Sequence, residues 1–232
     1  MITVRHSNDR GHANFGWLDT KHSFSFGDYY DPEHMGFSVL RVINDDVIEP
    51  GKGFDTHGHR DMEILTYVLE GAIEHKDSEG NTRILSEGEF QLMSAGRGIY
   101  HSEYNPSNDK ALRLLQIWIE PNQLGGQPGY QQKDFGKSVG LTPIATPTGE
   151  HSTLTLKQNA SLYQLVLPAN SSLKLELGMN RNMYIHQVSG DLMLVNQVEL
   201  HSGDGAKIDA HSHVELVNQS AESVVALVFD LP

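Results

Sequence analysis

Residues 51–71 read GKGFDTHGHRDMEILTYVLEG, and residues 96–105 read GRGIYHSEYN. Each segment begins with glycine turns and continues as a run in which apolar and polar residues alternate, which is the pattern of a β-strand. Side chains two residues apart on a strand project from the same face. His57 and His59 therefore point one way from their strand, and His101 and Glu103 point one way from theirs.

The same alternation recurs along most of the chain, in short runs separated by turn sequences such as Asp77–Asn81. Long helical periodicity is almost absent. Many short strands joined by closely spaced glycine turns are typical of a β-sandwich or barrel. We therefore predict an all-β fold.

One stretch without periodicity, PNQLGGQPGYQQKDFG at residues 121–136, divides the chain. We predict that it links an N-terminal barrel, residues 1–120, to a C-terminal barrel, residues 137–232. The halves look like weak copies, because Gly71 and Gly88 bracket a hairpin in the first and Gly190 and Gly203 bracket one in the second. The alternative to duplication is that such glycine turns recur in any β protein.

The charge balance and the lack of cysteine limit the kinds of molecule that the protein is expected to bind. The chain has 17 basic and 30 acidic residues, a formal net charge of −13, and no cysteine. An acidic surface repels nucleic acid and anionic lipid, and the lack of cysteine excludes disulfides, thiol nucleophiles and thiolate metal sites. No signal peptide or transmembrane run is evident, so we expect a cytoplasmic protein that binds neither nucleic acid nor membrane.

The two histidine-containing segments predict a metal site. If their strands are neighbours in one barrel, three imidazoles and one carboxylate converge, a donor set that suits a divalent first-row metal. Histidine is frequent here, 13 in 232 residues, and a second His-x-His, His211-Ser212-His213, occurs late in the chain. An isolated pair is therefore weak evidence, and the glycines around His57 and His101 carry the argument.

These spacings resemble the two motifs of the cupin superfamily, Gly51-x5-His57-x-His59-x3-Glu63-x7-Gly71 and, after Gly88, Gly98-x2-His101-x3-Asn105. Within that superfamily the whole chain resembles the pirin family, and in particular its bacterial members of the quercetin 2,3-dioxygenase type. The stretches that carry the resemblance include LRVINDD at 40–46, THGHRDME at 56–63 and AGRGIYHSE at 95–103.

The resemblance implies a bicupin, two tandem cupin (jelly-roll) barrels of which only the N-terminal one binds metal. It assigns four ligands to that metal: His57, His59, His101 and Glu103. Fe²⁺ is the ion that the resemblance implies, and Zn, Mn, Ni, Co and Cu stay open because such a ligand set accepts several metals. The C-terminal barrel is then a degenerate cupin without metal.

Glu63 is treated separately. Ordinary cupins use the glutamate at this position as a ligand, whereas the chain resembles a variant in which Glu103 takes that part. Its even spacing from His57 and His59 predicts that Glu63 faces the same interior, where it would orient a histidine N–H. The alternative is a carboxylate on the barrel rim.

The resemblance also implies an activity, the opening of a flavonol heterocycle by O₂ with release of CO. The partners are then O₂ and a small aromatic oxyanion, and Glu103 is both ligand and proton acceptor. Met35, Phe37 and Phe54 are candidate pocket residues because they lie near the motifs. A non-catalytic metal-binding regulator and another cupin chemistry, such as sugar isomerisation, are the alternatives, and the protein is expected to be a monomer or a weak homo-oligomer.

Overall fold

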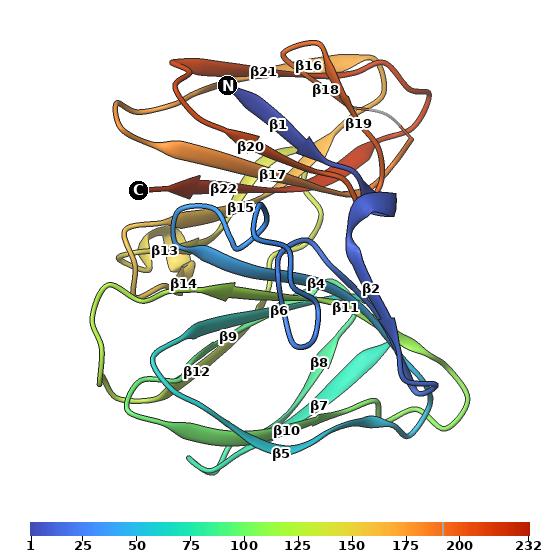
Figure 1. Cartoon of the computed structure of the whole chain (residues 1–232), viewed down its shortest axis with the longest axis vertical. Helices are drawn as coiled ribbons and strands as arrows, with labels where there is room; N and C mark the ends of the chain where they lie inside the picture. The colour runs from blue at the N-terminus through green and yellow to red at the C-terminus, as the bar shows by residue number, and fades with distance from the viewer. Residues whose placement is uncertain (192) are drawn as a thin grey trace. The chain divides into compact units, whose positions relative to one another are not determined.

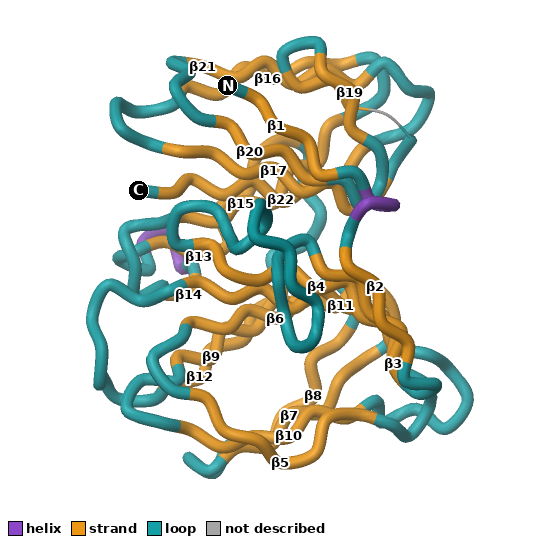
Figure 2. Tube along the Cα trace, in the orientation of Figure 1, coloured by secondary structure: helices purple, strands orange, loops and turns teal. Residues whose placement is uncertain are grey.

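The structure, a computed structural model, describes residues 1–191 and 193–232, and strands dominate it (Figure 1, Figure 2). The helices in these residues are two 3₁₀ turns, Ser7–Asp9 and Glu150–Ser152. None of the described helices is long and apolar enough to cross a membrane. The predicted all-β class is confirmed.

The chain forms two compact units. The N-terminal unit comprises residues 11–136 and 156–158, and the C-terminal unit comprises residues 1–10, 137–155 and 159–232. Each unit contains a seven-stranded and a four-stranded sheet.

In the N-terminal unit all strand pairs are antiparallel. The seven-stranded sheet has the order β12-β9-β6-β11-β4-β3-β2 and the four-stranded sheet the order β5-β10-β7-β8. The larger sheet consists of β2 (Gly11–Asn14), β3 (Leu18–His22), β4 (Leu40–Ile48), β6 (Glu63–Glu70), β9 (Glu89–Ser94), β11 (Leu112–Ile119) and β12 (Gly129–Asp134). The smaller sheet consists of β5 (Gly53–His59), β7 (Ala72–Asp77), β8 (Thr82–Ser86) and β10 (Ile99–Tyr104).

Apolar side chains from both sheets meet in the core of this unit. Val68 and Leu114 of the larger sheet pack with Ile73 and Leu85 of the smaller one, and all four are fully buried. Figure 1 shows β5, β7, β8 and β10 as one layer facing β6, β9, β11 and β12. The alternating burial along β10 places one face of that strand between the sheets.

The C-terminal unit repeats this architecture with the orders β1-β20-β17-β22-β15-β13-β14 and β16-β21-β18-β19. Its larger sheet consists of β1 (Ile2–Arg5), β13 (Gly140–Thr146), β14 (Leu154–Thr155), β15 (Ser161–Leu167), β17 (Asn182–Ser189), β20 (Gly205–Ile208) and β22 (Val224–Leu231). Its smaller sheet consists of β16 (Ser171–Glu176), β18 (Met193–Val195), β19 (Val198–Leu200) and β21 (His213–Asn218).

The glycines that indicated duplication occupy matching turns. Gly71 and Gly190 have φ of 83° and 97°, and Gly88 and Gly203 have φ of 86° and 85°. A side chain strains a backbone in this left-handed region, which is why glycine recurs there.

A buried asparagine fixes the same loop in both units. In the N-terminal unit the Asn105 side-chain amide donates hydrogen bonds to the carbonyl oxygens of Ile48 at 3.1 Å and Lys110 at 2.8 Å. Its Oδ1 accepts a hydrogen bond from the Ser107 backbone N–H at 3.0 Å. Asn105 therefore stabilises a turn.

Asn218 does the same in the C-terminal unit. Its amide donates to the carbonyl oxygens of Leu167 at 2.9 Å and Glu222 at 2.7 Å, and its Oδ1 accepts from the Ser220 N–H at 2.9 Å. Because Asn105 and Asn218 make matching contacts, they provide a fixed point for comparing the two units.

The structure differs from the sequence-based division in two places. Residues 129–134 of the expected linker form β12, which pairs with β9 and completes a sheet. Residues 2–5 form β1, which pairs with β20, so the first ten residues belong to the C-terminal unit. Both segments are edge strands recruited by exposed backbone groups of a distant strand, which a local pattern does not reveal.

Replacing Asn105 by alanine should destabilise the protein by about 2–3 kcal/mol, because buried carbonyl groups lose their donor. The exposed neighbour Asn108 is a matched control, whose alanine variant should lie within about 0.5 kcal/mol of the wild type. Denaturant unfolding measures both. Equal stability of the two variants would contradict the role given to Asn105.

Candidate metal centre and cavity

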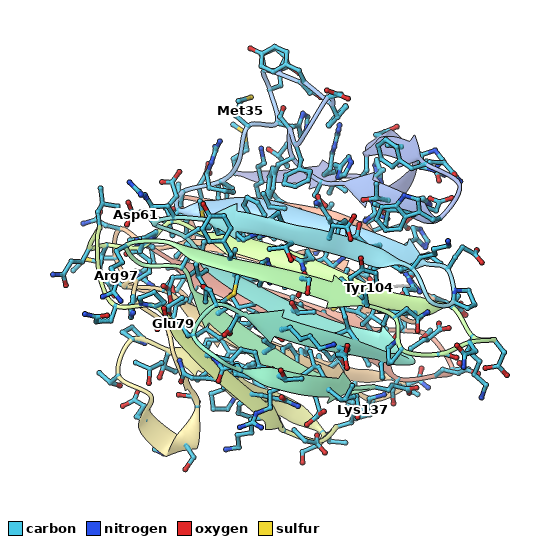
Figure 3. All side chains as sticks on the ribbon, turned by 90° about the horizontal axis from the view of Figure 1, so that it is seen from below. Met35, Asp61, Glu79, Arg97, Tyr104 and Lys137 are labelled. Carbon is cyan, nitrogen blue, oxygen red and sulfur yellow. The ribbon has the colours of Figure 1, made fainter. Side chains whose placement is uncertain are left out.

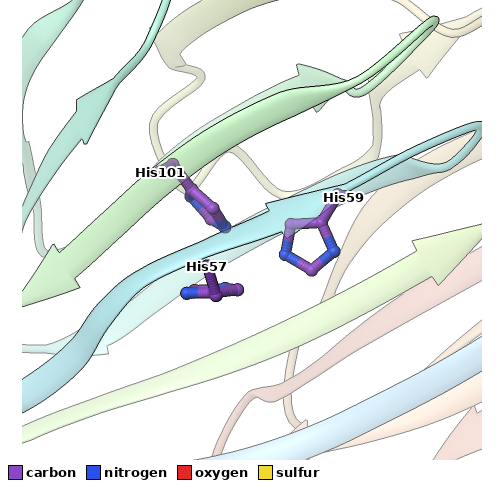
Figure 4. A group of neighbouring side chains, drawn as sticks. All are labelled: His57, His59 and His101. Atoms are coloured by element: carbon purple, nitrogen blue, oxygen red, sulfur yellow. The ribbon is translucent and has the colours of Figure 1, made fainter.

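Strands β5 and β10 are antiparallel neighbours, with His57 directly opposite His101 and His59 opposite Ile99. The three imidazoles point toward one another (Figure 4). The ring centroids of His57 and His101 lie 4.4 Å apart, those of His57 and His59 4.8 Å, and those of His59 and His101 4.9 Å. One nitrogen of each ring lies within 4.8 Å of the others, so the three rings can share one ion.

Glu103 lies two residues beyond His101 on β10, and the two side chains are 1% and 2% exposed. A register shift between them alters the pairing with β5, whereas the pairing with β7 is regular. The Glu103 carboxylate forms a group with His101 and His75 within 4.8 Å. The structure thus brings the three predicted imidazoles together and places Glu103 beside His101.

Hydrogen bonds orient two of the rings. Nδ1–H of His57 donates to the carbonyl oxygen of Asp55 at 2.7 Å, which leaves Nε2 as the lone-pair donor. Nδ1 of His101 lies 3.5 Å from Nδ1 of His75, whose Nε2 lies 2.9 Å from the carboxylate of Asp77. Such an outer chain fixes the orientation of a ligating imidazole.

Sequence reasoning missed His75 and Asp77. Their His-x-Asp spacing on a strand puts both on one face, as in the two triplets that were recognised. The missing information was the pairing of β7 with β10, which sets His75 opposite Glu103.

The electrostatics favour neutral imidazoles. Burial, and then the neighbouring His57, lowers the pKa of His59 to about 4. Burial, with the other histidines adding to it, lowers the pKa of His101 to about 2. A neutral imidazole keeps the lone pair that a metal requires.

Glu103 is shifted in the opposite sense. Burial raises its pKa to about 7, and the hydrogen bond from Gln116 partly opposes this effect. The Gln116 amide donates to Oε2 of Glu103 at 2.7 Å and accepts at Oε1 from the Trp118 indole N–H at 3.2 Å. A bound cation would favour the ionised carboxylate.

The residues present fit a divalent metal. Nε2 of His101 and Oε1 of Glu103 are buried and have no hydrogen-bond partner in the described part of the chain. Buried polar atoms are normally satisfied, and a metal ion held between these two would satisfy both. Nitrogen donors with one carboxylate oxygen match the preferences of first-row divalent ions.

A cavity of about 780 Å³ within the N-terminal unit adjoins these side chains. Most of its wall is aromatic or apolar, with Trp17 and Phe54 in edge-to-face contact at 5.3 Å and Phe26 and Trp118 at 5.3 Å. Its polar lining includes His57, His59, Glu103, Gln116, Asp46, Thr20, Asn44 and His22.

Of the three predicted pocket residues, the structure places Phe54 on the cavity wall. Met35 and Phe37 are not among the lining residues. Met35 is 38% exposed and lies on a loop that projects from the strands (Figure 3). Nearness in sequence to the motifs did not bring these two side chains to the site, and the loop before Leu40 lines the cavity with residues 26–29 instead.

Glu63 also differs from its predicted role. Its Oε2 accepts hydrogen bonds from the Ser94 hydroxyl at 2.9 Å and the Lys157 backbone N–H at 3.2 Å, and these partners are not histidines. The parity argument fails because the chain turns between His59 and Glu63, where Asp61 has a φ of 50°. Glu63 begins β6 in the other sheet and ties in residues 156–158.

The C-terminal unit carries apolar side chains at the positions of the metal ligands. Counting back from Asn105 and Asn218, the places of His101 and Glu103 are taken by Val214 and Leu216, both fully buried. Leu175 lies opposite Val214, as His57 lies opposite His101.

The second His-x-His of the chain does not form an equivalent site. Its last residue, His213, also begins the triplet His213-Val214-Glu215, which has the spacing of His101-Ser102-Glu103. Counted from Asn218, however, this triplet lies one residue earlier along its strand than the metal-binding triplet does from Asn105. His213 and Glu215 are therefore exposed.

The chain matches known proteins over its whole length. A family model described as Pirin matches residues 3–119, and one described as Quercetinase C-terminal cupin domain matches residues 143–231. The chain is 47% identical over 232 residues, 100% of it and 99% of the relative, to a protein of Escherichia coli K12 named quercetin 2,3-dioxygenase.

Solved structures of related proteins have the same fold as this chain. The bacterial pirin YhhW from Escherichia coli in complex with nickel(II) matches with a TM-score of 0.97 and 46% identity over 100% of this chain and 99% of that one. A quercetin 2,3-dioxygenase from Acinetobacter baumannii, 19% identical, shares the fold with a TM-score of 0.79 over 98% and 85%. These matches confirm the predicted bicupin architecture.

Alanine in place of His101 should abolish stoichiometric metal binding and leave the fold intact, since the apolar core does not depend on an ion. The matched control is His213→Ala, which removes the exposed histidine of the equivalent triplet and should bind as much metal as the wild type. Elemental analysis of the purified variants, with circular dichroism as the fold check, measures this. Full metal content in His101→Ala would refute the ligand assignment.

Lowering the pH should weaken metal binding because Glu103 takes up a proton, and not because His59 or His101 does. With a pKa of about 7, Glu103 takes up a proton below neutral pH, whereas pKa values of about 4 and about 2 keep both imidazoles neutral there. The apparent affinity for Ni²⁺ should therefore drop by up to about tenfold per pH unit below pH ~7. Titration of metal-free protein with Ni²⁺ at several pH values measures this dependence. If the affinity of the Glu103→Gln variant falls equally steeply, another group is responsible for the pH dependence.

Proposed function

The chain belongs to the pirin family, and from this premise we propose that it is a metal-dependent dioxygenase that opens the heterocycle of a flavonol such as quercetin with O₂ and releases CO. The convergence of three imidazoles beside an aromatic cavity carries the proposal. Relatives named quercetin 2,3-dioxygenase support it.

The metal would be held by His57, His59, His101 and Glu103, and would supply Lewis-acid stabilisation of a substrate oxyanion. Three neutral imidazoles and one carboxylate leave a divalent ion with a net positive charge, which favours a deprotonated hydroxyl group at the open position. Fe²⁺ is the ion we propose for the native protein. The Escherichia coli pirin that binds nickel supports a divalent first-row metal in general.

The aromatic wall would bind and orient the substrate. The volume of about 780 Å³ lies in the range of small-molecule sites, and the rings of Trp17, Phe26, Phe54 and Trp118 can pack against a flat ligand. Such packing excludes water from the reacting face. A wall of this kind favours a planar aromatic substrate over a sugar.

Glu103 would also accept the proton of the substrate hydroxyl group. The Gln116 amide donates to Oε2, and Gln116 in turn accepts from the Trp118 indole N–H, so the carboxylate keeps one orientation. Burial raises the pKa of Glu103 and so favours uptake of a proton by the carboxylate, whereas a bound cation would act in the opposite sense. Positioning by this chain of hydrogen bonds is the contribution of the protein to the proton transfer.

An assay in air tests the proposal. Protein loaded with Fe²⁺ should consume O₂ and release CO when quercetin is added, and no flavonol should disappear under nitrogen. Absence of O₂ uptake with each of the candidate divalent metals would overturn the proposed reaction. Turnover of a sugar without O₂ would favour an isomerase.

Glu103→Gln should retain some metal and lose turnover by about 10²-fold or more, because a neutral amide does not accept the proton. Glu215→Gln changes the exposed glutamate of the equivalent triplet in the other unit and should turn over quercetin like the wild type. Rates normalised to bound metal separate loss of catalysis from loss of the ion. Unchanged turnover in Glu103→Gln would remove Glu103 from the mechanism.

A further inference from the structure

Two polar side chains on the cavity wall have no part in the metal centre. Thr20 on β3 and Asp46 on β4 lie directly opposite each other in register, and both line the cavity. Each is 3% exposed. They belong to the polar part of the lining, on the same two strands as His22 and Asn44.

The fold leaves one oxygen of the Asp46 carboxyl group without a hydrogen-bond partner in the described part of the chain. Its neighbour Asp45 points to the opposite face of β4, where both oxygens accept hydrogen bonds from Arg113 at 3.0 Å. Oδ1 of Asp46, by contrast, is buried and has no hydrogen-bond partner among the residues described. Because a buried carboxyl oxygen without a partner is destabilising, such an atom beside a cavity indicates a group supplied by a ligand.

The surroundings define the chemistry of that group. An ionised carboxyl group accepts hydrogen bonds and a neutral one can also donate, so a hydroxyl group, which does both, suits either state. The Thr20 hydroxyl beside Asp46 can donate to the same partner, and a hydroxyl group is both donor and acceptor. The aromatic rings of Trp17, Phe26 and Trp118 line the same cavity and favour a hydroxyl group that is carried by a flat apolar body.

Asp46 is distant in sequence from the predicted metal ligands but lines the same cavity as three of them. Asp46 and Glu103 both line this cavity, where burial and, to a lesser extent, the charge of Asp46 raise the pKa of Glu103. A ligand with one oxygen at the imidazoles can therefore reach Asp46 with another part of the same ring system.

We propose that Asp46 and Thr20 form a recognition site for a second hydroxyl group of the aromatic ligand, distinct from the one held at the metal centre. The cavity then selects aromatic ligands with at least two hydroxyl groups. This inference rests on the proposed function for the orientation of the ligand, and it names the class of flavonol that the cavity prefers.

The two tryptophans of the chain provide the readout, since Trp17 and Trp118 both line the cavity. Quenching of their fluorescence measures ligand binding to nickel-loaded protein under nitrogen, independently of turnover. The probes are unsubstituted flavonol, which has one hydroxyl group, and galangin, which carries two more on the fused ring. The wild type should bind galangin about tenfold or more tightly than flavonol.

Asp46→Ala should reduce this preference to about twofold or less while binding flavonol like the wild type. Asp46→Asn keeps an acceptor oxygen and should retain most of the preference. Thr20→Val keeps the shape of the side chain without the hydroxyl group and should weaken the preference, and it serves if Asp46→Ala does not fold. Asp45→Ala, on the opposite face of the same strand, should leave the preference unchanged.

Equal binding of the two probes by the wild type, no binding of either, or an undiminished preference in Asp46→Ala and Thr20→Val would overturn the inference. Oxygen uptake with quercetin is measured separately. A preference for galangin without turnover leaves the recognition site standing and rejects the proposed reaction. Turnover without the preference rejects only the recognition site.

Discussion

The pairing of β5 with β10 is the constraint on which the site depends. Antiparallel register sets His57 directly opposite His101, and the alternation of a strand turns His59 and Glu103 to the same side. Backbone hydrogen bonds between the two strands hold this register, so the donor atoms are placed before any ion binds. A slip of one residue would turn each ligand to the other face.

The C-terminal unit shows what such a slip produces. Its strand β21 also carries a His-x-Glu triplet, but one residue out of step with the buried asparagine that fixes the following loop. Val214 and Leu216 then point inward and join a continuous apolar core, whereas His213 and Glu215 face solvent. The same topology therefore supports a packed core in one unit and a polar centre in the other.

Burial shifts the pKa values of the titratable side chains around the metal centre and the cavity of the N-terminal unit. Burial holds His59 and His101 neutral, and it raises the pKa values of Glu103 and Asp46 to about 7. Burying groups of this kind destabilises a fold unless a partner compensates. The hydrogen bond from Gln116 offsets part of this cost at Glu103, and a bound metal ion would stabilise its ionised form.

The sequence by itself determined the all-β class, the two similar halves and the faces on which His57, His59, His101 and Glu103 lie, because alternation along a strand is a local property. Only the tertiary structure decided which strands became neighbours. It placed the ring of His75 beside that of His101 and placed Asp46 on the cavity wall. It also paired Glu63 with the Ser94 hydroxyl rather than with a histidine. Side-chain parity holds within one strand and is lost wherever the chain turns into another sheet, as it does at Asp61.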